Sequence, residues 1–97
     1  MLTAIVRFKL PKGMALDDAK AIYEKSVPSY KGAAGLVRKY YLFGEDQVGG
    51  GVYLWQNREA AEKMYTSTWK KMITERYGTP PEITYYETPV IVDNSSE

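Results

Sequence analysis

The sequence contains neither cysteine nor histidine. The lack of cysteine excludes a thiolate nucleophile, a disulfide, a cysteine-bound iron–sulfur cluster and a cysteine-bound zinc. The lack of histidine excludes an imidazole base, a Ser-His-Asp triad and a histidine-bound metal or haem. The sequence also offers no clear cluster of carboxylates, so we expect no metal site. A general base in this chain would have to be a lysine, an ionised phenol or a carboxylate.

A strong charge excess and a long apolar run are also missing. Thirteen Lys and Arg residues balance twelve Asp and Glu residues, which gives a net charge of +1. Binding to nucleic acid or to anionic lipid calls for a basic excess, so we expect neither kind of partner. No apolar run approaches the roughly 20 residues that span a bilayer, and the first residues lack the charged-then-apolar order of a signal peptide. The expected location is the cytoplasm.

What the sequence does contain is a globular composition that is rich in tyrosine. Hydrophobic residues make up 44% of the 97 residues, charged residues 26% and aromatic residues 13%, and nine residues are Tyr. This composition predicts a single folded domain over residues 1–97, with a frayed polar tail at 93–97. Hydrophobic spacing and turn residues predict strands at 2–10, 36–43, 48–55 and 83–92 and helices at 16–27 and 57–77.

Single residues mark the expected ends of these elements. Pro28 is expected to break or kink the first helix, and Gly32 is expected to follow its end as a cap. Asn57 is a suitable N-cap for the second helix, and Gly78 is expected to close that helix. Pro89 is expected to interrupt the last strand, because proline cannot donate a hydrogen bond to a neighbouring strand.

The order β-α-β-β-α-β is that of the ferredoxin-like α+β fold, a four-stranded antiparallel sheet with two helices on one face. An antiparallel sheet that leaves its second face in water normally carries polar residues there. The second strand instead has apolar residues in both alternating sets, which are Leu36, Tyr40 and Leu42 in one and Val37, Tyr41 and Phe43 in the other. We therefore expect the uncovered face to pack against the same face of a second copy, in a symmetric homodimer.

Two short segments carry a resemblance to a known family. They are Gly35-Leu36-Val37-Arg38-Lys39-Tyr40-Tyr41-Leu42 and Gly49-Gly50-Gly51-Val52-Tyr53-Leu54-Trp55, and an alanine-rich helix follows the second. Over about residues 2–92 the chain resembles the dimeric α/β-barrel proteins, and within them the YdhR-type and antibiotic-biosynthesis-type monooxygenases. The resemblance implies a homodimer with a pocket between sheet and helices, and an oxygenation of an aromatic, polyketide-like small molecule without any cofactor. Relatives that use a catalytic or haem-binding histidine are no guide to mechanism, because this chain has none.

Five aromatic residues on the predicted strands and second helix form the candidate substrate-binding set. Their rings would stack a flat ligand, while their phenol and indole groups would donate hydrogen bonds. The five are Tyr41, Trp55, Tyr65, Trp69 and Tyr85. The alternative is that these rings fill the core and the dimer interface, although buried Tyr and Trp side chains then need hydrogen-bond partners.

Arg38 and Lys39 are the candidate catalytic residues. They are neighbours in a strand, so one side chain faces the helices and the other faces the dimer interface. A cation beside a pocket would stabilise an enolate, a phenolate or a peroxide. The resemblance places a lysine at position 39, which favours Lys39. The alternative for either cation is an ion pair, for example with Glu87, or a side chain that extends to the rim.

The three glycines at 49–51 do not predict a phosphate-binding loop, because such loops open a helix and these glycines enter a strand. A bulge, or the close approach of another backbone or of a ligand, is the expected reason for them. Two other functions stay open on the same scaffold, an isomerase or lyase and a non-catalytic ligand-binding or stress-related dimer. RNA binding fits the element order, but Gly50 and Val52 stand where RNA-recognition motifs have stacking aromatics.

Overall fold

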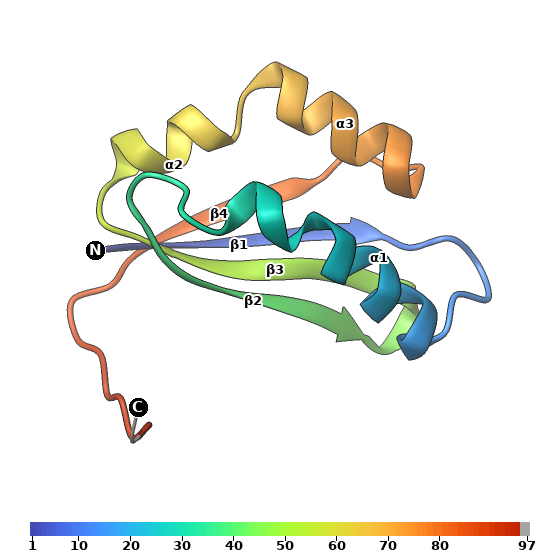
Figure 1. The fold of residues 1–97 in the computed structure, drawn as a ribbon, viewed down its shortest axis with the longest axis horizontal. Helices are drawn as coiled ribbons and strands as arrows, with labels where there is room; N and C mark the ends of the chain where they lie inside the picture. The colour runs from blue at the N-terminus through green and yellow to red at the C-terminus, as the bar shows by residue number, and fades with distance from the viewer. Residues whose placement is uncertain (96–97) are drawn as a thin grey trace.

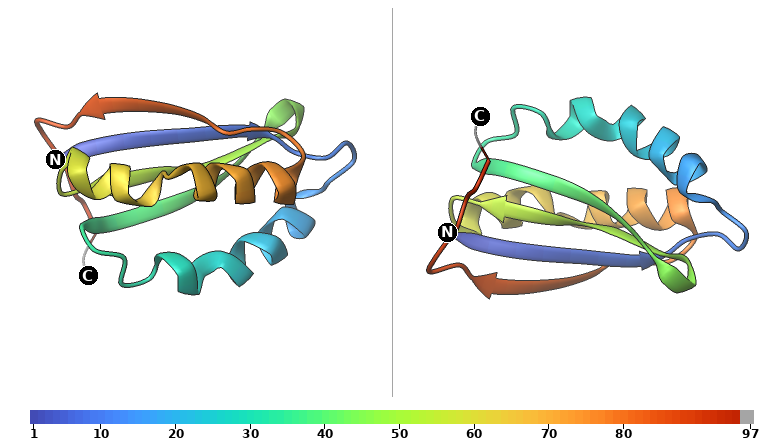
Figure 2. Two further views of the ribbon diagram at one scale, coloured as in Figure 1. Left: turned by 90° about the horizontal axis from the view of Figure 1, so that it is seen from above. Right: turned by 90° about the horizontal axis from the view of Figure 1, so that it is seen from below.

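Four strands form one antiparallel sheet in the computed structural model, which describes residues 1–95. The elements are β1 (Leu2–Lys9), α1 (Leu16–Tyr30), β2 (Leu36–Gly44), the 3₁₀ turn η1 (Glu45–Gln47), β3 (Val48–Trp55), α2 (Arg58–Met64), α3 (Ser67–Tyr77) and β4 (Glu82–Glu87). The order across the sheet is β2-β3-β1-β4, so β2 and β4 are the edge strands. Helices α1, α2 and α3 lie on one face, with α1 along β2 (Figures 1 and 2). The predicted ferredoxin-like α+β fold is confirmed.

A bulge near the start of β2 decides which side chains face the helices. Leu36 lies opposite Trp55, whereas Arg38 lies opposite Leu54, so Val37 is the extra residue. Simple alternation had placed Leu36 with Tyr40, and that prediction is wrong. The bulge moves Leu36 to the helix side, where it packs against the core, and leaves Val37 exposed.

Helix α1 continues through Pro28 to Tyr30, so the predicted end at Val27 is wrong. Proline removes only one hydrogen bond of the helix, the bond that its own N–H would donate. Burial of Tyr30 offsets this loss, because its ring lies in the core and its hydroxyl accepts a hydrogen bond from Trp69 Nε1 at 2.9 Å. Lys31 is the C-cap, and Gly32 follows with φ +81°, a left-handed conformation that suits glycine.

The predicted long second helix is divided into α2 and α3. Asn57 caps α2 as expected, since its side chain accepts a hydrogen bond from Ala60 N. Thr66 then caps a new helix by accepting a hydrogen bond from Trp69 N. Tyr65 is the C-cap residue of α2 and is buried. Gly78 closes α3 in the left-handed conformation, as predicted.

The last strand is shorter than predicted, because β4 ends at Glu87 and residues 88–95 form no strand. Pro89 cannot donate to a neighbouring strand, and it follows the end of β4 closely. The segment 88–95 instead leaves the sheet on the side opposite to the helices (Figure 1). The predicted frayed tail at 93–97 falls partly outside the described residues. No helix within residues 1–95 has the length and apolarity to cross a membrane, and the cytoplasmic location stays a prediction.

The sheet has one buried face and one open face. Helix-side residues such as Ala4, Val6 and Trp55 are almost completely buried. The face turned away from the helices, which we call the open face, is seen in the right view of Figure 2. Its side chains include Ile5, Arg38, Tyr40, Leu42, Val52, Leu54 and Tyr86. Tyr40 and Tyr86 are 55% and 52% exposed, so large aromatic and apolar side chains lie uncovered on this face in the single chain, beside polar ones such as Thr84.

Candidate functional site

The side chain of Lys39 enters a group of tyrosine rings beneath α1. Lys39 pairs with Tyr53 of the adjacent strand and therefore faces the helices. Its Nζ lies 3.3 Å from the ring centroid of Tyr30, 3.9 Å from that of Tyr41 and 4.5 Å from that of Tyr53. The faces of aromatic rings carry partial negative charge, so the three contacts stabilise an ammonium group at this position.

Burial acts against this attraction and changes the protonation of the amine. Loss of hydration, followed by the positive charge of Arg76, lowers the pKa of Lys39 from 10.5 to about 7. Burial raises the pKa of Tyr53 and of Tyr65, so both phenols stay protonated at neutral pH. Of the candidate bases in this part of the molecule, Lys39 is the one that is partly unprotonated near pH 7.

The three glycines form the floor beneath this group. A Cβ on Gly51 would press on Lys39 Cε and on the ring of Tyr53, and a Cβ on Gly49 would overlap the hydroxyl of Tyr23. Gly50 has φ +151°, and a Cβ there would overlap the carbonyl oxygen of Val6. The expected close approach of another backbone is confirmed, and the absent side chains leave room for the lysine and the tyrosines.

Arg38 points to the open face, so the register resolves the question of which cation faces the helices. Its guanidinium lies 3.4 Å from a carboxylate oxygen of Asp93, and both side chains are largely exposed. Arg38 also donates a hydrogen bond to the Tyr40 hydroxyl. The ion-pair partner of Arg38 is thus Asp93 rather than Glu87. A solvent-exposed ion pair of this kind contributes little stability. Arg38 and Lys39 thus face opposite sides of the sheet, although both belong to the lining of one groove at the edge strand β2.

The predicted aromatic residues form a continuous core cluster. Trp55 Nε1 donates to the Tyr65 hydroxyl at 3.1 Å, and the two rings meet edge to face. Tyr65 also packs against Trp69. The guanidinium carbon of Arg58 lies over the ring of Tyr85, 4.3 Å from the ring centroid. Trp55, Tyr65 and Trp69 are at most 7% exposed. Their polar groups find partners inside the protein, which meets the requirement for burying them.

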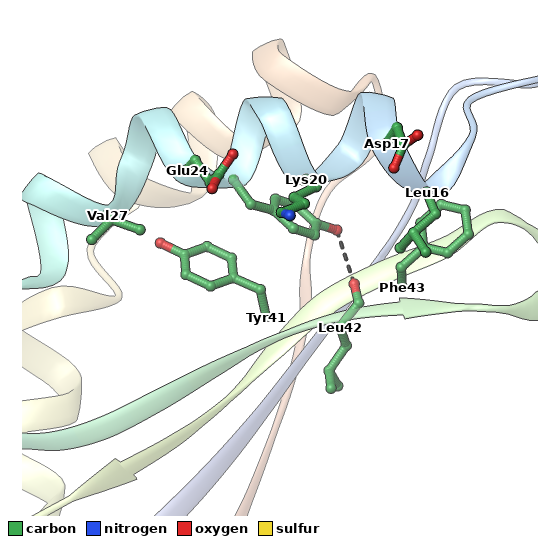
Figure 3. Close-up of a pocket in the computed structure, with 9 residues that line it drawn as sticks. Leu16, Asp17, Lys20, Glu24, Val27, Tyr41, Leu42 and Phe43 are labelled. Carbon is green, nitrogen blue, oxygen red and sulfur yellow. Dashed lines mark hydrogen bonds between the residues drawn. The ribbon is translucent and has the colours of Figure 1, made fainter.

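The space for a ligand lies along α1 and β2 rather than inside this cluster. The cavity enclosed by the tyrosines near Lys39 measures only about 10 Å³. Two open grooves of about 420 and 470 Å³ lie between α1 and the edge strand β2. Tyr41 and Val27 line both grooves, and Lys39 lines the second. Figure 3 shows the first groove, where Tyr41 and Phe43 point up toward α1 and the side chain of Leu42 points away.

Of the predicted substrate-binding residues, Tyr41 thus lines these grooves, whereas Trp55, Tyr65, Trp69 and Tyr85 do not. Their role in binding stays a prediction. The sequence reasoning missed Tyr30, Tyr53 and Arg76, which surround Lys39. Tyr53 could have been found, because it occupies an inward position of the third strand. Tyr30 could not be placed beside Lys39, because the first helix was expected to end before it. Arg76 could not be placed there either, because the sequence did not predict which way its side chain faces.

Among residues 1–95, no three Asp or Glu side chains gather in a group that could hold a metal ion. No family model matches the sequence, and no curated protein matches it. Solved structures do match it at low sequence identity. A protein of unknown function from Nitrosomonas europaea is 13% identical with a TM-score of 0.73, and the match covers 98% of this chain and 95% of that chain.

Two of the matching structures are oxygenases. A monooxygenase of Streptomyces coelicolor, solved in complex with the ligand nanaomycin D, is 13% identical with a TM-score of 0.69 over 97% of this chain and 92% of that chain. SnoaB, a cofactor-independent oxygenase of Streptomyces nogalater, is 14% identical with a TM-score of 0.66 over 94% of this chain and 95% of that chain. A special likeness to the YdhR type stays a prediction. The chain has the ferredoxin-like fold of the antibiotic-biosynthesis-type monooxygenases, as the resemblance implied.

Proposed function

We propose that this chain is a cofactor-independent monooxygenase that acts on an aromatic, polyketide-like substrate and uses Lys39 as its general base. The observation that carries the proposal is the buried amine of Lys39 among three tyrosine rings, at the side of an open groove. The fold shared with two oxygenases supports the reaction class. A base works best when its pKa lies near the working pH, and burial has brought the pKa of Lys39 to about 7.

The substrate would lie in the groove between α1 and β2. A groove of about 470 Å³ is within the range of small-molecule sites. Tyr30 and Tyr41 line it together with Lys39, so a flat ring can stack while the C–H bond that loses its proton meets the amine. The apolar part of the wall comes from Val27 and Leu36. A groove between α1 and β2 agrees with the expected pocket between sheet and helices, while the other aromatic residues fill the interior beneath the helices.

The reaction balances without any cofactor when the substrate has a C–H bond made acidic by a neighbouring carbonyl. The neutral amine of Lys39 takes that proton and leaves a delocalised carbanion. The carbanion gives one electron to dioxygen, and the resulting superoxide and substrate radical combine to a peroxide. The proton returns from Lys39 to the peroxide, which loses water and leaves a new carbonyl. In sum, a CH₂ group and O₂ become a C=O group and H₂O.

Oxygen uptake with a hydroxylated anthrone as test substrate checks the proposal. We expect uptake above the uncatalysed rate, with an increase through about pH 7 as Lys39 loses its proton. Lys39→Met should lower the rate by about 100-fold or more, the usual contribution of a general base. Lys63→Met is the matched control, since Lys63 lies on the surface beside Glu59.

Three results would reject the proposed function. Uptake that is unchanged in Lys39→Met would remove the lysine from the reaction. Tight binding of the anthrone without any oxygen uptake would favour the alternative function, a non-catalytic ligand-binding protein. Conversion of the substrate to an isomer without uptake of oxygen would favour the isomerase.

We also propose that the active form is a homodimer that covers the open face. Tyr40, Leu42 and Tyr86 are exposed on this face, and Val90 and Val92 of the segment after β4 are 77% and 80% exposed. A hollow of about 450 Å³ separates that segment from the sheet, with Val52 and Leu54 in its floor. Burial of roughly 800 Å² on each subunit would be enough for a stable contact.

A further inference from the structure

The two open grooves between α1 and β2 follow one another along the helix. The first groove is lined by residues of α1 between Leu16 and Val27 and by residues 41–43 of β2. The second groove continues from Val27 past the end of α1, and its β2 wall consists of residues 36–39 and 41. Val27 and Tyr41 belong to the lining of both. They therefore mark the junction of the two grooves, and Figure 3 shows them side by side at one end of the first groove.

The side chain of Tyr41 is held in place at this junction by the buried Ser26. The Ser26 hydroxyl donates to the carbonyl oxygen of Tyr23 at 2.8 Å. Its single proton is used there, so in the 2.8 Å contact between the Ser26 and Tyr41 hydroxyls the tyrosine is the donor. The ring of Tyr41 also stacks on that of Tyr23, with centroids 5.0 Å apart. Because both its hydroxyl and its ring are held, Tyr41 is a fixed wall.

The two grooves differ in the chemistry that they offer. The second groove has the amine of Lys39 and the ring of Tyr30 in its lining. The charged side chains of the first groove are instead Asp17, Lys20 and Glu24 of α1. A ligand that reacts at Lys39 therefore lies in the second groove. A longer ligand that extends along α1 into the first groove has to pass Tyr41.

We propose that Tyr41 is a specificity-determining residue, which separates the two grooves and thereby limits the length of the flat ligand that binds beside Lys39. The inference rests on the proposed function for the placement of the ligand in the second groove. Extra atoms forced against a fixed side chain disfavour binding, as they disfavour folding in a packed core. Without the ring of Tyr41, the two grooves would form one continuous channel.

Binding of two hydroxylated quinones, one with three and one with four linearly fused rings, tests this role. A quinone has a carbonyl group where the anthrone has its reactive CH₂ group, so it binds without reacting. The fluorescence of each quinone gives its dissociation constant. The unchanged protein should bind the three-ring quinone about tenfold more tightly than the four-ring quinone. Tyr41→Ala should bring this ratio close to one.

Two further variants test the same junction with the ring of Tyr41 still present. Ser26→Ala removes the hydrogen-bond partner of Tyr41, so the ratio should be intermediate. Val27→Ala widens the junction from the side of the helix and should also lower the ratio. Val27 is 40% exposed, so this variant should fold. The matched control is Val48→Ala, which should keep the ratio because Val48 lines neither groove.

The inference is overturned if the unchanged protein binds both quinones equally or binds neither. It is also overturned if the preference for three rings persists in both Tyr41→Ala and Val27→Ala. The outcome is separable from the proposed function. Oxygen uptake with the anthrone but no preference between the quinones would reject the role of Tyr41 alone, whereas a preference that Tyr41→Ala removes, without any oxygen uptake, would reject the oxygenase alone.

Discussion

Neighbouring residues of β2 show how much a side chain's surroundings change its chemistry. Arg38 lies in water beside Asp93, where its charge costs little. Lys39 lies one residue further on, and its amine is surrounded by three tyrosine rings. The two cations are similar in sequence terms, yet only the second has a pKa near neutrality. The pleat of the strand, which sends successive side chains to opposite faces, creates this difference.

The buried amine predicts an unusual dependence of stability on pH. The pKa of Lys39 is 10.5 in the unfolded chain and about 7 in the folded one, so between these values the unfolded chain binds the extra proton. The free energy of unfolding should therefore rise with pH from about 7 to 10, by at most about 1.4 kcal/mol per pH unit. Above pH 10 the buried tyrosines act in the opposite direction, because their pKa values are raised on folding.

Urea unfolding of the protein and of Lys39→Met, at equal protein concentration, checks this expectation. The methionine variant should be more stable than the unchanged protein at pH 7, and its free energy of unfolding should stay level up to about pH 9.5. The control Lys63→Met should show the same increase in the free energy of unfolding with pH as the unchanged protein. Parallel curves for the protein and Lys39→Met would show that the amine is not buried.

At the residue scale, the sequence identified Lys39 but not its surroundings. The strand alternation required one of Arg38 and Lys39 to face the helices, and the resemblance favoured Lys39. The tyrosines that hold its amine come from α1, β2 and β3, and contacts between such distant segments leave no local pattern. Trp55, Tyr65 and Trp69 are buried, and each indole N–H donates to a phenolic oxygen, while their role in substrate binding stays a prediction.

Element ends were predicted well where a capping residue determines them. Asn57 and Gly78 act as expected, because cap preferences depend on nearby backbone groups. The break at Thr66 was missed, because a threonine inside a helical pattern is also an ordinary helix residue. The bulge at Val37 was missed as well, since one extra residue in a strand changes no composition. That bulge exchanges the faces of Leu36 and Val37.

Within β3, Gly50 is the position that should tolerate substitution least. Its φ of +151° is rare for residues with a Cβ, and a methyl group there would overlap the Val6 carbonyl oxygen. Gly50→Ala should lower the free energy of unfolding by more than about 3 kcal/mol or prevent folding. The control is Gly13→Ala, because Gly13 also has a positive φ but no atom lies near an added Cβ. Thermal unfolding of both variants measures the two losses of stability, and equal losses would contradict the argument.

The whole molecule has more apolar surface than one chain covers. The helices bury one face of the sheet, and the open face keeps Tyr40, Leu42 and Tyr86 in water. The sequence predicted this imbalance because both alternating sets of β2 are apolar. It did not predict the segment 88–95, which lies on the side opposite to the helices and is linked to Arg38 through Asp93. A dimer would cover both the sheet and this segment.

Sedimentation at micromolar concentration tests the dimer. The unchanged protein should sediment as a dimer, and Leu42→Glu should sediment as a monomer, because a carboxylate would have to be buried at the contact without a partner. The side chain of Leu42 is exposed in the single chain, so the variant should still fold. Met72→Glu is the control, since Met72 lies on α3 away from the open face. A stable monomer of the unchanged protein would refute the dimer.

The most direct test of the account is an NMR titration of the Lys39 side chain in the protein as it stands, assigned with Lys39→Met. The central claim is that a lysine amine, enclosed by Tyr30, Tyr41 and Tyr53, exchanges its proton near neutral pH. The account predicts one lysine with a pKa of about 7. A value near 10.5 for Lys39 would contradict the account, because the amine would then be protonated at neutral pH and could not serve as the base.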